Sequence, residues 1–251
     1  GRRGPSHNTT NNMTPLQSED LTQQNHEWLL GEYLQTFMGF RPESVLDVGC
    51  GAGTLLKQLR ENGMHVQGLD QAGPRLEQLR ADGYDVHEGS AYKLPFDDNS
   101  FDWVSMRHVP HHLEQPATAF AEALRVARTG LFLAEPYFDR SVASQRAAIC
   151  LDKWEKQQHR RRGMFHAEVM DLGTLLGLMP TNDAQEHSTE VFQALRLQSR
   201  SVPEFEAEAR ALLDSLPQDA EQAVALDQLL ALLAKDGLSW NGSLCLAILR
   251  A

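Results

Sequence analysis

The chain contains 251 residues with a formal net charge of −11 at pH 7, and 41% of the residues are hydrophobic. This length suffices for one domain with a buried core, and no apolar run reaches the roughly 18 residues that a membrane span requires. The acidic balance opposes non-specific attraction to nucleic acids and anionic membranes, so we expect neither as a partner.

The cysteines and the first residues indicate the compartment and the start of the fold. Cys50, Cys150 and Cys245 are widely spaced and odd in number, which fits neither a disulfide framework nor a zinc site. We therefore predict a cytoplasmic protein. Residues 1–15 are polar and lack the apolar core of a signal peptide, so we expect a flexible N-terminal arm or a vector remnant.

A helix is predicted before the sheet, and from residue 44 the chain alternates strand-like and helix-like segments. The first helix is indicated by the helical spacing of Trp28, Leu29, Tyr33 and Phe37. Strands are predicted at 44–48, 65–70, 86–88, 101–106 and 130–136, and helices at 54–62, 74–81 and 116–127. This alternation predicts a parallel sheet covered by helices on both faces.

The pattern changes after Pro136. Helices are predicted at 141–162 and 169–178, with two more within 203–235 that are broken at Pro217. Strands at 185–197 and 240–249 are expected to form a hairpin-like edge of the sheet. The sequence thus predicts an α/β fold with a doubly wound, seven-stranded, mostly parallel sheet. Residues 16–251 form a single domain in this prediction, with cap helices from about 17–40 and 138–180.

The turn after the first predicted strand carries three glycines in the stretch VLDVGCGAGTL, residues 45–55. Glycines between a strand and a helix let a ligand approach the backbone at the carboxyl end of the sheet. The pattern is G-x-G-x-G, with Thr54 where a dinucleotide-binding motif would place its third glycine. Asp70 ends the second strand, 21 residues after Gly49, where a carboxylate can accept hydrogen bonds from ribose hydroxyls.

Four segments occur in the order typical of class I S-adenosylmethionine-dependent methyltransferases: VLDVGCGAGTLL, VQGLD, EGSAYKLPFDDNSFDWV and HVPHHLEQPATAFAEALRVARTGLFLAEP. The chain resembles this family over about residues 41–137, and it is most similar to the small-molecule branch that includes ubiquinone and menaquinone biosynthesis enzymes. The resemblance implies a Rossmann-like methyltransferase fold with S-adenosylmethionine as cofactor and S-adenosylhomocysteine as product. It also implies methyl transfer to a small-molecule acceptor.

The same resemblance implies the cofactor-binding residues. The glycines would face the methionine and ribose, Asp47 would orient the amino group, Asp70 would hold the ribose and Gln71 would lie beside the adenine. Ser90 replaces the aspartate that usually binds the adenine amino group. The full set is Asp47, Gly49, Cys50, Gly51, Gly53, Asp70, Gln71, Ser90, Ala91, Met106 and Arg107.

The segment RHVPHHLEQP, residues 107–116, follows the fourth strand and in the family meets the sulfonium and the acceptor. His108 and His112 are therefore the candidate catalytic bases, since histidine exchanges a proton near neutral pH. An alternative is that His112 orders the loop through a backbone hydrogen bond. The histidines of this turn lack an established metal-ligand spacing, and no metal site is predicted.

Candidate acceptor-binding residues lie in the first helix, the turn and the cap. Three consecutive arginines, 160–162, could bind a carboxylate or phosphate, although a solvated helix face gives the same pattern. The acceptor-binding set is Tyr33, His111, Glu135, Tyr137, Arg161 and His166.

In-line displacement at a sulfonium needs alignment above all, which can contribute on the order of 7–11 kcal/mol. A base is needed only when the acceptor retains its proton. The alternatives are a catalytically silent cofactor-binding protein and a nucleic-acid methyltransferase, while Thr54 opposes a dehydrogenase. The acceptor atom (O, N or C) and the oligomeric state, monomer or homodimer, stay open.

Overall fold

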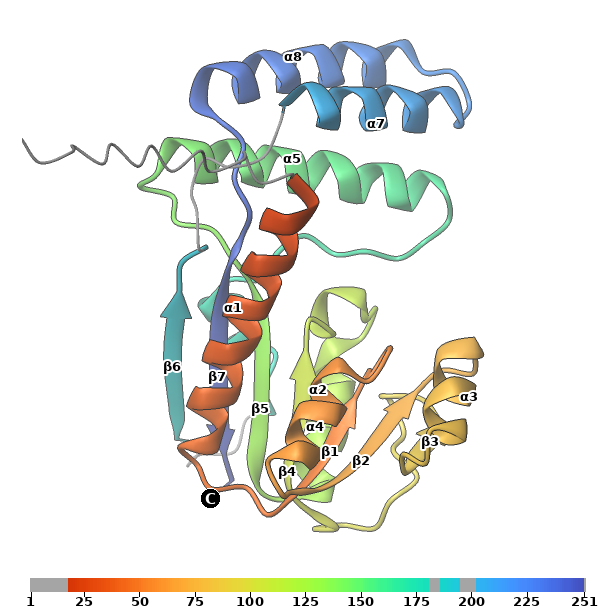
Figure 1. Ribbon diagram of the computed structural model, residues 1–251, viewed down its shortest axis with the longest axis vertical. Coiled ribbons are helices and arrows are strands. Elements are labelled where there is room, and N and C mark those ends of the chain that lie inside the picture. The colour runs from red at the N-terminus through yellow and green to blue at the C-terminus, as the bar shows by residue number, and fades with distance from the viewer. Residues whose placement is uncertain (1–17, 181–185, 195–201, 251) are drawn as a thin grey trace, which may run out of the picture.

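The computed structural model describes residues 18–180, 186–194 and 202–250 (Figure 1). The predicted N-terminal arm, residues 1–15, lies outside this part of the chain. The strands are β1 Ser44–Val48, β2 His65–Asp70, β3 Val86–Glu88, β4 Phe101–Arg107, β5 Ala127–Tyr137, β6 His187–Phe192 and β7 Gly242–Leu249. The helices are α1 Ser18–Met38, α2 Thr54–Glu61, α3 Pro74–Ala81, α4 Pro116–Val126, α5 Ala143–Arg161, α6 Leu172–Gly177, α7 Val202–Asp214 and α8 Ala220–Asp236, with a 3₁₀ turn, η1, at Pro110–His112.

The strands form one seven-stranded sheet in the order β3-β2-β1-β4-β5-β7-β6. Strands β1 to β5 pair in parallel, whereas β7 pairs antiparallel with both β5 and β6. The predicted doubly wound, mostly parallel sheet is confirmed, and so is the pairing of its last two strands at an edge. The order reverses between β1 and β4, and in open α/β sheets ligands bind at the carboxyl ends of the strands that flank such a reversal.

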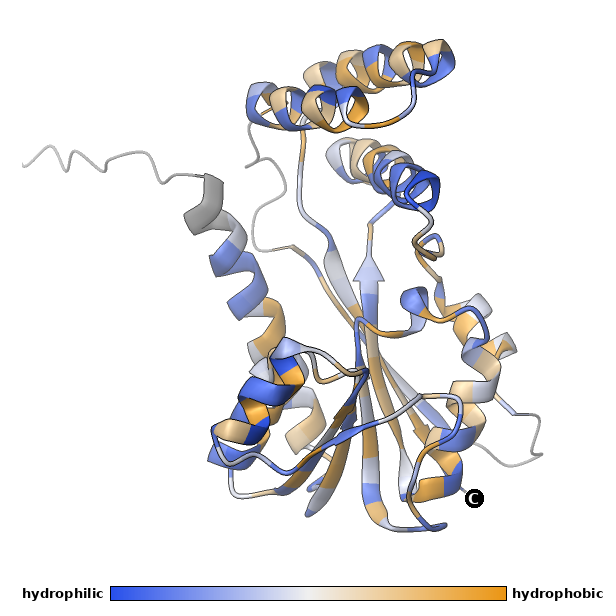
Figure 2. Cartoon of the chain, turned by 90° about the vertical axis from the view of Figure 1, so that its right-hand side faces the viewer, coloured by the Kyte–Doolittle hydropathy of each residue, from blue (hydrophilic) through white to orange (hydrophobic). Residues whose placement is uncertain are grey.

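Alternation along each strand sends side chains to two separate cores. On β5, Leu131 and Leu133 pack with α4 and α6, whereas Phe132 packs with α1 and α2 on the opposite face. Phe132 stacks on Phe37 of α1 with ring centroids 4.7 Å apart and an angle of 6°. Figure 2 shows hydrophobic residues concentrated along the strands between these helical layers. This period of two follows from strand geometry.

Helices α5, α7 and α8 form a separate layer beyond the edge at which the parallel strands end (Figures 1 and 2). Their shared core includes Leu151, Trp154, Phe205 and Leu229. Within the expected cap segments, 17–40 and 138–180, Tyr33 and its neighbours hold α1 on the sheet, while α7 and α8 cover α5. In the part of the chain that the structure describes, no helix is both long and apolar enough to cross a membrane.

Candidate functional site

The three glycines of the turn after β1 all have positive φ, but only one of them leaves open space. A Cβ on Gly49 (φ +73°) would lie 2.5 Å from a methyl carbon of Val109, and one on Gly53 (φ +77°) would lie 2.4 Å from a methyl carbon of Leu79. A Cβ on Gly51 (φ +55°) would be 4.0 Å from the Gly49 carbonyl oxygen, with no other described atom within that distance. Two glycines thus permit packing within the protein, and Gly51 leaves room for something else.

Asp70 connects the end of β2 to this turn. One of its carboxylate oxygens accepts a hydrogen bond from the Gly51 amide at 2.6 Å, and the other accepts one from the Gln71 amide at 2.7 Å. Each oxygen retains a further lone pair for a ligand. The two amides therefore fix the orientation of the carboxylate while leaving it able to accept two hydroxyl groups.

A cavity of about 450 Å³ opens at the carboxyl ends of β1 and β2, a volume typical of small-molecule sites. Seven predicted site residues line it: Gly49, Asp70, Gln71, Ser90, Ala91, His108 and His112. Six further residues, which were not predicted from the sequence, complete the wall: Val48, Leu69, Gly89, Tyr92, Val109 and Leu113. Tyr92 helps to close the wall because its hydroxyl accepts a hydrogen bond from the Glu114 amide at 2.9 Å.

The side chains of two residues predicted to bind the cofactor point into the core of the protein, and their assignment to the cofactor stays a prediction. Cys50 packs among Leu56, Leu79 and Val86 beneath the turn, and burial raises the pKa of its thiol to about 12. Met106 is fully buried in the core on the α4 face. On β4 the alternation that turns Met106 toward α4 turns Ser105 to the other face.

A polar cluster lies on the α1 face of the sheet, below the glycine turn. The Tyr33 hydroxyl is 2.9 Å from Ser105 Oγ and donates to the Phe132 carbonyl at 3.2 Å. Ser105 in turn donates to one oxygen of Asp47 at 3.4 Å, while the other oxygen is buried without a partner among the described residues. Tyr33 therefore supports the sheet and does not line the cavity described above, and its assignment to acceptor binding stays a prediction.

Burial governs the charges of this cluster. It raises the pKa of Asp47 to about 7, an effect that the Ser105 hydrogen bond and the nearby Arg107 reduce. Burial also lowers the pKa of Arg107, against the attraction of Tyr33 and Asp47. The structure therefore keeps a buried carboxyl group, one oxygen of which lacks a partner among the described residues, within electrostatic range of a guanidinium.

His108 lies directly after β4 in an unusual conformation. Its φ of +57° falls in the left-handed region, which costs a non-glycine residue on the order of 1–3 kcal/mol. Its Nε2 atom is buried without a partner among the described residues, and the ring lines the cavity. Burial and the neighbouring Arg107 hold the pKa of His108 well below its ordinary value, so the ring is neutral near pH 7.

Four histidines gather beside the cavity. The Nδ1 atom of His111 lies 3.0 and 2.9 Å from the two carboxylate oxygens of Glu135, which is fully buried. His166, from the segment after α5, has its ring centroid 5.1 Å from that of His111 and 4.5 Å from that of His112. His159 stacks on His166, with their Nδ1 atoms 2.8 Å apart. Neither His111 nor Glu135 lines the cavity, and their assignment to acceptor contact stays a prediction.

The arginines at the end of α5 bind other parts of the helical layer. Arg161 donates to the side chain of Gln158 and to the Pro217 carbonyl, and Arg162 donates to Ser215. Arg160 donates to the His166 carbonyl oxygen. None of the three lines the cavity described above or the larger one described next. The assignment of Arg161 to an anionic acceptor stays a prediction that these contacts do not support.

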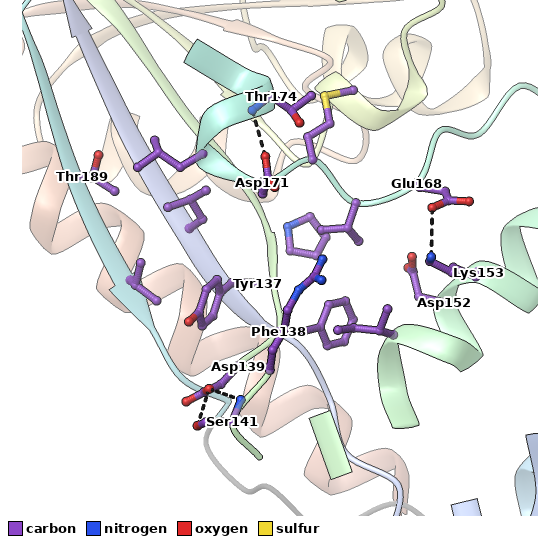
Figure 3. Close-up of a pocket in the computed structure, with 18 residues that line it drawn as sticks. Tyr137, Phe138, Asp139, Ser141, Asp152, Lys153, Glu168, Asp171, Thr174 and Thr189 are labelled. Atoms are coloured by element: carbon purple, nitrogen blue, oxygen red, sulfur yellow. Dashed lines mark hydrogen bonds and ion pairs between the residues drawn. The ribbon is translucent and has the colours of Figure 1, made fainter. Parts of the chain in front are cut away.

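A second cavity, of about 580 Å³, lies between β5, β7, α5 and α6 (Figure 3). Apolar and aromatic side chains that include Tyr137, Phe138 and Met170 line it, together with the Lys153–Glu168 ion pair at 3.5 Å. Figure 3 shows this pair bridging α5 and the segment before α6. Of the predicted acceptor-binding residues, Tyr137 is the one that faces this space.

Residues 46–134 match the family model described as a methyltransferase domain. The chain is 37% identical over 90 residues to the demethylmenaquinone methyltransferase of Renibacterium salmoninarum, covering 35% of this chain and 38% of that protein. It is 26% identical over 165 residues to the ubiquinone biosynthesis O-methyltransferase of Hahella chejuensis, covering 55% of this chain and 69% of that protein. These matches confirm the family resemblance seen in the sequence motifs.

The solved structure of a Bacillus halodurans protein assigned as a methyltransferase superposes with a TM-score of 0.52 at 19% identity. The superposition covers 88% of this chain and 97% of that one, which confirms the Rossmann-like methyltransferase fold. The chain spans between 31% and 44% of the length of three of the curated relatives that it matches. The family match itself begins in β1 and ends in β5.

Proposed function

We propose that this chain, which carries a methyltransferase domain over residues 46–134, transfers the methyl group of S-adenosylmethionine to a small-molecule acceptor. The proposal rests on the hydrogen bond that Asp70 accepts from the Gly51 amide at 2.6 Å. Asp70 lines a cavity that lies where the strand order of the sheet reverses. A carboxylate in this position suits the two ribose hydroxyls of the cofactor, and the open space at Gly51 suits close approach of its backbone to the ligand.

The remaining cofactor contacts are assigned by position in the cavity. Gln71, Ser90 and Ala91 would surround the adenine, since they lie beyond Asp70 along the wall. Asp47 and Arg107 would meet the methionine end, where the cofactor carries an ammonium and a carboxylate. The unpartnered oxygen of Asp47 supports this assignment, because a buried carboxylate without a hydrogen bond is stabilised by an incoming cation.

The acceptor is proposed to be neutral or aromatic. The arginine cluster is engaged within the helical layer, and the second cavity is lined by side chains such as Tyr137, Phe138 and Leu244. The two named relatives act in menaquinone and ubiquinone biosynthesis, which is compatible with an aromatic acceptor. His108 is the proposed proton acceptor, because it lines the cavity, its ring is neutral and its Nε2 has no hydrogen-bond partner among the described residues. His112 lines the same cavity and is the second candidate.

Mass spectrometry of the purified protein, followed by incubation with S-adenosylmethionine and pools of phenolic and amine acceptors, tests the function. Formation of S-adenosylhomocysteine that depends on an acceptor supports it. Binding of the cofactor without turnover of any pool would favour the catalytically silent alternative.

The three free cysteines support the proposal of a cytoplasmic location, where thiols stay reduced.

Asp70→Ala is expected to weaken binding of both S-adenosylmethionine and S-adenosylhomocysteine. Loss of charge-assisted hydrogen bonds to the ribose corresponds to about 1–3 kcal/mol, or about 5- to 150-fold in Kd. Isothermal titration calorimetry measures the change, and Asp82→Ala, an exposed position after α3, is the matched control. Asp70→Asn keeps an oxygen for the Gly51 amide, so it separates turn ordering from ribose binding. Equal affinities in the native protein and Asp70→Ala would contradict the assignment.

A further inference from the structure

We propose that His111, His112 and His166 form a binding site for a divalent transition-metal ion of the zinc class. The three side chains each offer a nitrogen, and these atoms all lie within 4.8 Å of one another. Ligand nitrogens around tetrahedral zinc, each about 2.0–2.1 Å from the ion, are about 3.4 Å apart. Small side-chain rotations toward a shared centre therefore suffice to bring the three nitrogens to bonding distance.

In two of the three imidazole rings, Nδ1 contacts a neighbouring side chain and Nε2 is available to bind a metal ion. Glu135 accepts from His111 Nδ1 with both oxygens, which leaves Nε2 for a metal ion. A buried carboxylate that orients a histidine in this way is the usual outer-shell partner of a histidine metal ligand. The Nδ1 of His166 is likewise engaged by His159, while its Nε2 is buried without a partner among the described residues.

The chemistry of the donors selects the ion. Imidazole nitrogens suit zinc, cobalt, nickel and copper, whereas magnesium and calcium require oxygen ligands. Metal binding requires neutral imidazole rings. The buried ammonium group of Lys156, on α5, is paired with Asp152 at 3.0 Å.

Three protein ligands leave a fourth coordination position open, as in zinc enzymes that bind water or substrate. His112 lines the smaller cavity, and Glu168, two residues after His166, lines the larger one. An ion bound by His112 would lie beside the cavity proposed to hold the cofactor. Polarisation of an acceptor oxygen or nitrogen by this ion rests on the proposed function, whereas metal binding itself does not.

Titration of the chelator-stripped, full-length protein with Co²⁺ tests the site, since this ion reports its ligands by visible absorption. We expect saturation at about one equivalent, followed by displacement with Zn²⁺. His166→Ala removes one ligand from a segment outside the helices and should abolish this stoichiometric uptake. His65→Ala, an exposed position at the start of β2, should bind as the native protein does. No saturable uptake, or equal uptake by the His166→Ala variant, would overturn the proposal.

Glu135→Gln separates a metal site from a merely packed histidine cluster. Loss of an outer-shell carboxylate is expected to weaken metal binding about 10- to 100-fold. Circular dichroism verifies folding, and Zn²⁺ should raise the melting temperature of the native protein but not of His166→Ala. Calorimetry with S-adenosylmethionine is run in parallel. If the native protein binds S-adenosylmethionine but takes up no metal ion, only this inference is overturned. If the native protein binds neither, the proposed function is overturned as well.

Discussion

Gly51→Val is expected to abolish cofactor binding while the protein stays folded. The valine methyl groups would enter the open space beside Gly49, whose backbone forms part of the cavity wall. We expect Kd for S-adenosylhomocysteine to rise by more than about 100-fold, equivalent to about 2.8 kcal/mol. Calorimetry measures the affinity, and circular dichroism with thermal melting measures the fold.

The conformation of Gly51 requires a matched control, because a valine at φ +55° is strained wherever it occurs. Gly83 has φ +78°, and a Cβ there would meet no described atom within 4 Å. Gly83→Val therefore imposes similar strain in the turn after α3, away from the cavity. It should lower the melting temperature comparably and leave cofactor affinity unchanged. Retained binding by Gly51→Val would mean that the turn is purely structural.

Gly49 and Gly53 illustrate what the glycine pattern alone left unresolved. All three positions look equivalent in the sequence, yet Val109 and Leu79 occupy the space next to Gly49 and Gly53. These neighbours come from the loop after β4 and from α3, so the distinction depends on tertiary packing. The pattern predicted the turn correctly and left open which glycine a ligand needs.

Most strand positions were predictable because buried parallel strands form short apolar runs between polar turns. The bounds of β1, β2, α3 and β3 agree with the prediction, whereas β5 begins three residues earlier than expected, at Ala127. The predicted cap role of α1 depended on an apolar stripe that is compatible with either a cap or a sheet-packing helix. Stacking of Phe37 on Phe132, 95 residues away in the chain, decides between them.

The histidine cluster could not be predicted from the sequence either, because it also depends on contacts between residues far apart in the chain. His111 and His112 are adjacent in η1, but His166 reaches them from the segment that returns from α5 toward the sheet (Figure 1). A hydrogen bond from the Ala167 amide to the His111 carbonyl oxygen, at 2.8 Å, fixes this approach. The spacing of the histidines within residues 107–116 does not match a known metal-binding motif. In the folded chain, His166 supplies the third proposed ligand.

Asp47→Asn is expected to change the pH dependence of stability more than other single charge removals in this sheet. Burial raises the pKa of Asp47 from 3.8 to about 7, so the native state retains a proton that the unfolded chain releases at lower pH. The native protein is therefore destabilised progressively as pH rises from about 4 to about 7. At about 1.4 kcal/mol per pKa unit, the difference approaches about 4 kcal/mol on the plateau above pH 7.

The amide that Asp47→Asn introduces cannot ionise, so the free energy of unfolding of this variant should fall less over that interval. Urea unfolding at pH 5 and pH 8 measures the two slopes, and the comparison is insensitive to any constant effect of the amide. Asp102→Asn is the control, because the pKa of Asp102 is shifted in the opposite direction from that of Asp47. Although partial burial raises the pKa of Asp102, hydrogen bonds from Arg128 and from the Ser44 amide lower it overall, so its removal should cost stability above pH 4. Parallel slopes for Asp47→Asn and the native protein would show that Asp47 is not a strained buried carboxyl group. Divergent slopes together with weakened S-adenosylmethionine binding would show that the free protein retains a destabilising carboxylate because the bound ligand supplies its counter-charge.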